Sequence, residues 1–206
     1  MKMLVVLGGL LLFLFSTGLA QGRLSLAPTI QFDRGSYVAK ARSNYVHGDE
    51  ANYMGNTLGY SLGLTAHYYV TDRWDLSLGT LRTQLTDRAE IKLLNPSRPT
   101  GTWTQDYNYY QVPISLNYRS SQKRLGAYIS LGAILSNQPI MNNLARVKTS
   151  AFVGVGINYQ LAPKLSLLLQ PTVSYLFSKP KDSTSLIFEM YQSSLLGLQM
   201  QLLWRP

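Results

Sequence analysis

Cysteine is absent from this 206-residue chain, and histidine occurs only at His47 and His67. Disulfides and thiolate metal ligands are therefore excluded, and two histidines supply too few ligands for a metal site, so we expect neither metal nor cofactor. Charged residues are scarce, at 14%, whereas a soluble domain usually carries more of them on its surface. Long apolar runs are missing after Gln21, so no later segment predicts a membrane-spanning helix.

The apolar run that is present lies at the start of the chain, from Leu4 to Phe15. Lys2 precedes it and small residues follow it, which is the pattern of a secretory signal peptide. An uncleaved membrane helix is the alternative, but the run is short for a span. We expect residues 1–20 to be a cleaved signal peptide and residues 21–206 to form one domain.

The rest of the chain shows alternation, most clearly between Asn56 and Asp87. Every second residue from Leu58 to Val70 is apolar or aromatic, and the residues between them are mostly small or polar. This period of two predicts a long strand. A polar corner at residues 71–73 follows, and the alternation resumes at Trp74, so the whole stretch predicts a hairpin with one apolar face.

The polar face of this hairpin and of the later strands consists mainly of Gly, Ser, Thr, Asn and Gln, with few charges. Such residues make a poor soluble surface, but they fit the interior of a narrow barrel whose apolar face meets lipid. The sequence therefore predicts an all-β fold, an eight-stranded antiparallel up-and-down transmembrane β-barrel. A soluble lipocalin-like carrier is the alternative, with the apolar faces turned inward.

The connections between the predicted strands alternate between long and short. Strands are predicted at residues 23–32, 56–70, 74–87, 103–118, 125–135, 151–159, 165–177 and 193–204. Long surface loops are predicted at residues 33–55, 87–102, 136–149 and 178–192. Bacterial outer-membrane barrels have short periplasmic turns and long exterior loops. We therefore expect this chain in the outer membrane of a Gram-negative bacterium.

Aromatic residues gather near the strand ends on the predicted lipid face, where amphipathic rings prefer the membrane interface. Those expected at the level of the short turns are Tyr68, Trp74, Tyr118, Tyr159 and Trp204. Those expected in a second belt toward the long loops are Phe32, Tyr60, Tyr110 and Phe177. For any single ring the alternative is ordinary packing, but five at one level favour a lipid-interface girdle.

Two prolines, Pro113 and Pro171, lie inside predicted strands. A proline lacks the backbone N–H that a closed barrel needs on every strand. We expect a bulge or a locally broken hydrogen-bond ladder at each.

His67 and Asp75 are expected to lie close together on the lumen face of the hairpin, with Ser77 one inward position further on. Ser77, His67 and Asp75 would then suggest a nucleophile, a base and an orienting acid, respectively. The simpler interpretation is a hydrogen-bonded polar pair that fills the lumen, because buried polar groups need partners. We favour the polar pair and expect no catalytic activity.

The formal net charge is +9, and most of the excess lies at the predicted short turns. We define a basic periplasmic rim there, consisting of Arg73, Arg119, Lys123, Arg124 and Lys164, with Arg23 and Arg205 near it. Basic residues at a membrane surface attract anionic lipid headgroups, and a periplasmic protein partner is the alternative. Arg82 and Arg88 near the outer rim suggest contact with lipopolysaccharide phosphate. This distribution does not suggest a nucleic-acid partner.

Three stretches resemble a known family: YNYYQVPISLNY at Tyr107–Tyr118, RLGAYISLGAIL at Arg124–Leu135, and NYQLAPKLSLLLQPTVSYLF at Asn158–Phe177. They are similar to the PorT-like outer-membrane β-barrels of Bacteroidota, proteins of OmpA or OmpX size. These motifs are specific for architecture and not for activity. The resemblance implies a barrel, and the family's one well-known role is assistance to a dedicated secretion system.

The function expected from the sequence is a structural or surface-binding role, because loops on a rigid scaffold usually carry recognition residues. An accessory component of a secretion or assembly complex is the main alternative. A small pore is disfavoured, because side chains fill an eight-stranded interior. A lipid-modifying enzyme is disfavoured, because a buried lumen site has no obvious substrate entry. The expected partners are outer-membrane lipids, lipopolysaccharide and the barrel assembly machinery, with an envelope or secretion protein as a further possibility.

Overall fold

The computed structural model describes residues 23–43, 50–93, 101–121, 124–139, 145–177 and 186–205. The predicted signal peptide and Lys123 of the predicted rim lie outside these residues. The described residues form eight strands: β1 Leu24–Ser43, β2 Glu50–Tyr69, β3 Trp74–Leu93, β4 Gly101–Arg119, β5 Leu125–Pro139, β6 Ala145–Ala162, β7 Leu165–Leu176 and β8 Leu186–Trp204. Within the described residues, no helix has the length and apolar character needed to cross a membrane.

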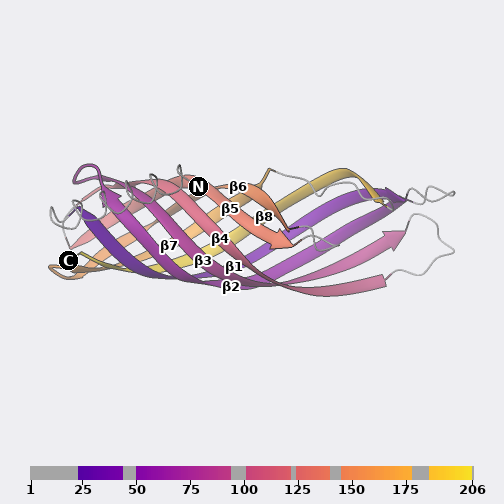
Figure 1. Ribbon diagram of the computed structural model, residues 1–206, viewed down its shortest axis with the longest axis horizontal. Coiled ribbons are helices and arrows are strands. Elements are labelled where there is room, and N and C mark those ends of the chain that lie inside the picture. Colours follow the sequence, from indigo (N-terminus) through magenta and orange to yellow (C-terminus); the bar gives the residue numbers. More distant parts are fainter. Residues whose placement is uncertain are drawn as a thin grey trace, which may run out of the picture.

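The strands form a closed ring in which each pairs with its sequence neighbours and β8 returns to pair with β1 (Figure 1). All pairs are antiparallel, including Leu26 opposite Trp204 at the closing seam. The predicted eight-stranded antiparallel up-and-down barrel is therefore confirmed. The connections β2–β3, β4–β5 and β6–β7 all lie at one end of the barrel, which we name the short-turn end; the opposite end is the extended end.

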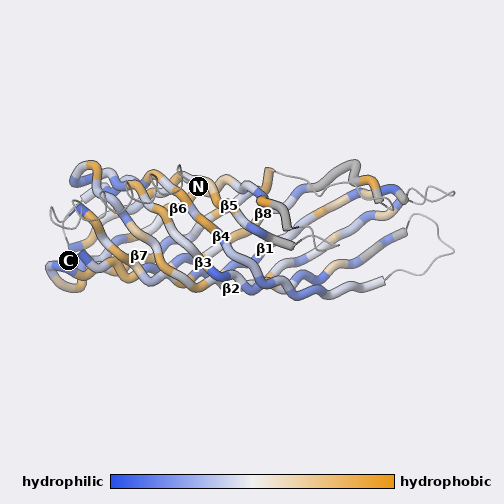
Figure 2. Tube along the Cα trace, viewed as in Figure 1, coloured by the Kyte–Doolittle hydropathy of each residue, from blue (hydrophilic) through white to orange (hydrophobic). Residues whose placement is uncertain are grey.

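Side chains alternate between the two faces of the wall as the sequence predicts. On β2, Leu58, Leu62 and Leu64 are exposed on the outer face, while Ser61 and Thr65 are buried inside. The outward apolar residues form an apolar band that begins at the short-turn end, and apolar colour is concentrated in that part of the barrel (Figure 2). On the extended side, the band ends near Phe32, Leu58, Leu78, Tyr110, Leu135, Ala151, Phe177 and Leu196.

Several strands continue beyond the apolar band, and this corrects the predicted loops. Residues 33–55 were expected to form one long loop, but β1 runs to Ser43 and β2 begins at Glu50. The pairing of β1 with β2 is continuous up to Arg42 opposite Glu50. The predicted loop was wrong because outward residues here are mostly polar, so the alternation of apolar and polar residues is lost although the backbone ladder continues.

The other predicted long loops are shortened in the same way. β3 extends to Leu93, β4 begins at Gly101, β5 extends to Pro139 and β8 begins at Leu186. We name the strand segments beyond the apolar band the extension. It consists of residues 34–43, 50–57, 81–93, 101–109, 136–139, 145–150 and 186–195. The extension gives the barrel the paired, elongated end on the right of Figure 1.

The prolines interrupt the ladder without a bulge. Pro113 pairs with Ile134 of β5, whereas the β3–β4 register skips from Leu78 to Leu81 and resumes unshifted. Pro171 pairs with Leu198 of β8, while the β6–β7 register skips from Gly154 to Ile157. Of the two expected outcomes, the structure thus has the locally broken ladder.

A third proline behaves in the same way and was missed from the sequence. Pro28 pairs with Leu64 of β2, and the β1–β8 register skips from Leu26 to Thr29 without a shift. Each of the three prolines therefore loses pairing on one side only. The intact neighbour on the other side holds the register, because a one-residue slip would turn every side chain to the wrong face.

Candidate functional site

The lumen at the level of the apolar band contains the polar pair that the sequence suggests. His67 Nδ1 lies 2.9 Å from Asp75 Oδ1, and both side chains are almost fully buried. Asn117 Nδ2 donates to the same carboxylate oxygen over 2.6 Å, and Tyr128 donates its O–H to Asp75 over 3.2 Å. Asp75 therefore accepts bonds from three side chains on three strands and ties β2, β4 and β5 together through β3.

The geometry of this lumen cluster does not form a nucleophile–base pair. The second ring nitrogen of His67, Nε2, lies 2.9 Å from Gln201 Oε1, so both nitrogens are engaged. Ser77 is opposite His67 in the strand register, but its Oγ lies 2.5 Å from Ser115 Oγ. A general base needs a hydrogen bond to its nucleophile. The cluster is arranged as a hydrogen-bonded plug instead.

The interior around this plug is closely filled. Tyr128, Leu81 and Leu168 are among its largest fully buried side chains. The cavities at this level have volumes of about 10 Å³ each, about the minimum needed to hold one water molecule. Larger cavities lie toward the two ends, about 160 Å³ at the short-turn end and about 60 Å³ at the extended end.

The five aromatic residues assigned to the lipid interface lie at the short-turn end of their strands. Trp74 and Tyr118 are directly paired, with ring centroids 4.9 Å apart. Tyr159 carries the Arg124 guanidinium 5.3 Å above its ring. The other two residues are Tyr68, opposite Leu24, and Trp204, opposite Leu165. Their contact with the lipid interface stays a prediction.

The cations assigned to the rim do not share one environment. Arg73, Arg124 and Lys164 are exposed at the short-turn end. Arg119 is 9% exposed and lies inside the barrel, with its Nη2 3.4 Å from the Tyr69 hydroxyl oxygen. This differs from the expected surface position. Strict alternation along β4 would have predicted the inward position of Arg119, because Tyr118 points outward and the next residue of a strand points to the opposite face.

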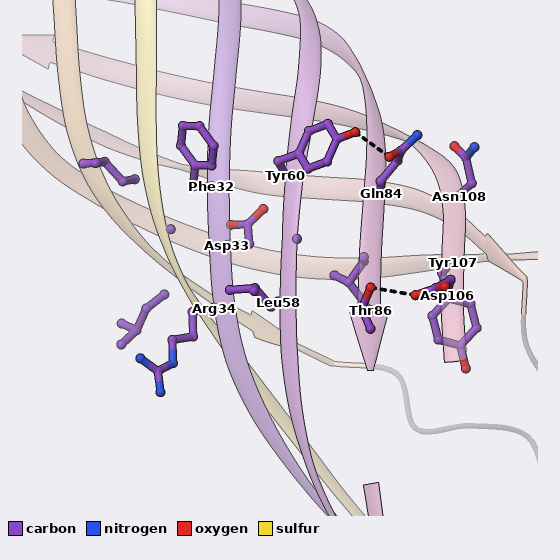
Figure 3. A pocket seen from close by; sticks show the side chains of 15 residues that line it. Phe32, Asp33, Arg34, Leu58, Tyr60, Gln84, Thr86, Asp106, Tyr107 and Asn108 are labelled. Atoms are coloured by element: carbon purple, nitrogen blue, oxygen red, sulfur yellow. Dashed lines mark hydrogen bonds between the residues drawn. The ribbon is translucent and has the colours of Figure 1, made fainter. Parts of the chain in front are cut away.

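A groove of about 890 Å³ crosses the outer wall where the apolar band ends (Figure 3). Two rows of outward side chains line it, and each row follows the strand register. The first row is Leu198, Phe32, Tyr60, Gln84 and Asn108, and the second is Leu196, Arg34, Leu58, Thr86 and Asp106. Both rows run from β8 through β1, β2 and β3 to β4.

The groove changes character along its length. Its β8–β2 part is mainly apolar, and Phe32 and Leu58 are 53% and 66% exposed. Its β3–β4 part is polar, with Tyr60 donating its hydroxyl to Gln84 and Thr86 donating to Asp106 over 2.6 Å (Figure 3). Arg34 is exposed at the edge of the apolar part. An apolar surface with polar partners at one end is suited to an amphipathic molecule. The sequence did not indicate this groove, because its two rows join residues from five strands.

The closed ring, the outer apolar band and the small polar interior together define a transmembrane β-barrel. The family model for the outer membrane protein beta-barrel domain matches residues 11–192, and the chain belongs to this family. Family membership places the protein in the outer membrane. In such barrels the short turns face the periplasm, so we expect the extension and the groove on the exterior side.

Solved structures with a similar fold include two proteins from Pseudomonas aeruginosa. The outer membrane protein OprG is 12% identical, with 86% of this chain and 95% of that chain covered and a TM-score of 0.46. The N-terminal β-barrel domain of OprF is 14% identical, with 84% and 97% covered and a TM-score of 0.39. The outer membrane protein AlkL, solved in DMPC bilayers, is 13% identical, with 87% and 89% covered and a TM-score of 0.49. No curated protein sequence matches this chain significantly.

Proposed function

We propose that this protein is a surface-binding barrel whose groove holds an amphipathic molecule of the outer leaflet, a glycolipid of the lipopolysaccharide class. The observation that carries the proposal is the change from apolar to polar along the two groove rows at the edge of the band. The hydrocarbon part would lie on Phe32 and Leu198, which are both outward and exposed. Arg34 would meet a phosphate, since guanidinium groups bind phosphate through two parallel hydrogen bonds.

The polar part of the groove would bind sugar hydroxyls. Gln84 and Asn108 present amide groups that both donate and accept hydrogen bonds. Asn108 is itself held by Arg82, whose Nε donates to Asn108 Oδ1 over 3.2 Å. This contact fixes the amide before a ligand arrives, and a preformed polar group lowers the entropy that binding costs.

The test measures binding of purified lipopolysaccharide to the refolded barrel in nanodiscs by native mass spectrometry. Arg34→Gln is expected to weaken saturable binding roughly tenfold, the usual effect of losing a hydrogen bond to a charged group. Arg73→Gln is the matched control, because it removes one exposed cation at the opposite end. Equal binding by both variants and the parent protein would contradict the proposal.

A second role is favoured by the exposed cations at the short-turn end. Arg73, Arg124, Lys164 and Arg205 are all exposed there, and clustered charge of one sign steers a complementary partner. This supports an accessory component of a secretion or assembly complex, the role associated with the PorT-like resemblance. Affinity capture with these four residues changed to Ser is expected to lose an acidic envelope partner; unchanged partners would contradict this role.

A further inference from the structure

The cavity at the short-turn end lies inside the barrel mouth and is distinct from the groove. Its volume is about 160 Å³, roughly five times the ~30 Å³ share of one water in the liquid. Three cationic side chains, Arg119, Lys164 and Arg205, line it, and Asp72 is the acidic side chain among its lining residues. The mouth therefore combines room for a small ligand with an excess of positive charge.

Aromatic rings fix the two arginines. The Arg119 guanidinium carbon lies 5.4 Å from the Tyr69 ring centroid and 5.9 Å from that of Tyr128. The Arg205 guanidinium carbon lies 4.1 Å from the same Tyr69 ring. The backbone N–H of Arg205 donates to the Lys164 carbonyl oxygen over 2.9 Å, which holds Arg205 at the mouth. Tyr69 thus has a guanidinium associated with it from β4 and another from the end of β8.

Two residues that line this cavity each have a buried polar atom without a hydrogen-bond partner among the described residues. Arg119 Nε is a donor without an acceptor, although its side chain is nine-tenths buried. Asn158 Oδ1 is an acceptor without a donor, and Asn158 is 3% exposed. Both residues line the cavity. Buried polar groups are rarely left unsatisfied, because each costs about 1–3 kcal/mol. A ligand that accepts from Arg119 and donates to Asn158 satisfies both.

We propose that the mouth of the barrel at the short-turn end is a binding site for a phosphate group that carries or adjoins a hydroxyl. The phosphate oxygens accept hydrogen bonds from Arg119 and face the charges of Lys164 and Arg205. The hydroxyl donates to Asn158 Oδ1. Hydrogenphosphate in the periplasm and the headgroup of phosphatidylglycerol both have this chemistry. Sulfate has the charge and lacks the hydroxyl.

The test follows the Arg119 Nε–Hε signal by NMR in octyl glucoside micelles while inorganic phosphate is added. The parent protein is expected to show a saturable shift and to bind phosphate more tightly than sulfate. Arg119→Lys keeps the charge but removes the Nε–H, and binding, followed for the variants by the Asn158 side-chain amide signal, is expected to weaken roughly tenfold. Arg124→Gln is the matched control, because that cation lies on the outer face over Tyr159.

The outcomes show whether phosphate binds at the mouth and whether its source is a free ion or a lipid headgroup. A linear shift, equal weakening in Arg124→Gln, or equal binding of sulfate would overturn the proposal. Arg205→Gln provides a second variant if Arg119→Lys does not give the heat-modifiable band of a folded barrel, and it is expected to weaken phosphate binding as well. Displacement of phosphate by phosphatidylglycerol in the same micelles identifies the lipid headgroup as the ligand. Retention of phosphate identifies the free ion.

Discussion

The apolar band and the extension use the same backbone ladder in two different solvents. In the band, outward residues such as Leu64 are apolar and the interior is dominated by neutral polar and aromatic groups around the His67–Asp75 pair. In the extension, the outward residues are mostly polar, and the inner face mixes apolar side chains such as Leu85 with charged groups such as Asp87 and Lys148. Register continues from one region into the other without a break between β2 and β3. The comparison shows that the pairing of strands depends on backbone hydrogen bonds, whereas the polarity of the outward residues depends on whether lipid or water surrounds them.

The largest effect is expected inside the band, at the plug. Asp75→Ala removes the acceptor for His67, Asn117 and Tyr128. Removing one member of a buried, hydrogen-bonded pair of ionisable side chains costs about 3–5 kcal/mol. We expect a loss of this size in urea unfolding of the barrel in lipid vesicles. The control Asp72→Ala, in the exposed β2–β3 turn, is expected to change stability by less than about 0.5 kcal/mol; similar losses in both variants would show that the plug is not stabilising.

The next largest effect is expected from an arginine placed on the outer face of β2, and its size should differ between the band and the extension. Leu64 and Asn56 are both outward and exposed on β2, in the band and in the extension respectively. Arg at the middle of a membrane barrel costs about 2–4 kcal/mol, and near the interface about 0–1. Leu64→Arg is expected to destabilise the folded barrel in vesicles by the larger amount and Asn56→Arg by the smaller. Equal costs would mean that the lipid boundary does not lie between these two positions.

A smaller effect compares two glycines. A Cβ at Gly63 would overlap the Thr80 carbonyl oxygen and the Leu81 Cα, whereas a Cβ at Gly101, where β4 begins in the extension, would have open space around it. Overpacking of this kind costs about 1–3 kcal/mol. Gly63→Ala is expected to lower the urea midpoint of the barrel, and Gly101→Ala is expected to leave it unchanged. If both are neutral, the wall of the band has more freedom than its packing indicates.

The last effect is a pH dependence confined to the extension. Burial lowers the pKa of Lys148 from 10.5 to about 8, while the nearby Asp87 carboxylate raises it. Burial also raises the pKa of Asp87, opposed by the Thr57 hydroxyl, which donates to it over 2.7 Å. The folded state binds the Lys148 proton more weakly than the unfolded chain does. Stability is therefore expected to rise as the pH increases from about 8 to 10.5.

Urea midpoints measured across this pH range check the Lys148 prediction. In Lys148→Met the rise is expected to disappear, because the titrating group is removed while most of the side-chain volume remains. A rise of the same size in the variant would assign the pH dependence to another group. Cε-labelled lysine NMR gives the pKa of Lys148 directly.

The sequence predicts the band well because lipid and lumen demand opposite residues. The alternation from Leu58 to Val70 predicts the part of β2 that lies in the band, and the corner at residues 71–73 marks the turn correctly. His67 and Asp75 are predicted from the sequence to lie near each other. In the structure they are diagonal neighbours on adjacent strands, because Asp75 is directly opposite Tyr69 and His67 is opposite Ser77. The short hairpin connection made this proximity accessible from the sequence.

The extension, the groove and the Arg119 site were not accessible in the same way. From Arg34 to Ser43 both faces of β1 are mixed, so a continued strand cannot be distinguished from a loop by period alone. The groove is formed by residues that lie side by side on five strands. Predicting which residues these are requires the register of every strand pair between β8 and β4. Arg119 was grouped with the rim by position in the chain, although the parity of β4 places it inside.

The seam between β1 and β8 has a consequence for when other proteins can bind to the strands of this barrel. β8 is the last described strand in the chain, and it bonds to β1, the first, from Leu26–Trp204 up to Ser43–Leu186. Until β8 is made, the sheet has open edges that can pair with another chain; after closure the apolar band has none, because each of its strands is paired on both sides. Any factor that recognises the band through a strand edge therefore has its opportunity before closure. In a mature copy, unpaired strand edges are left only in the extension, for example on β4 before Gln111.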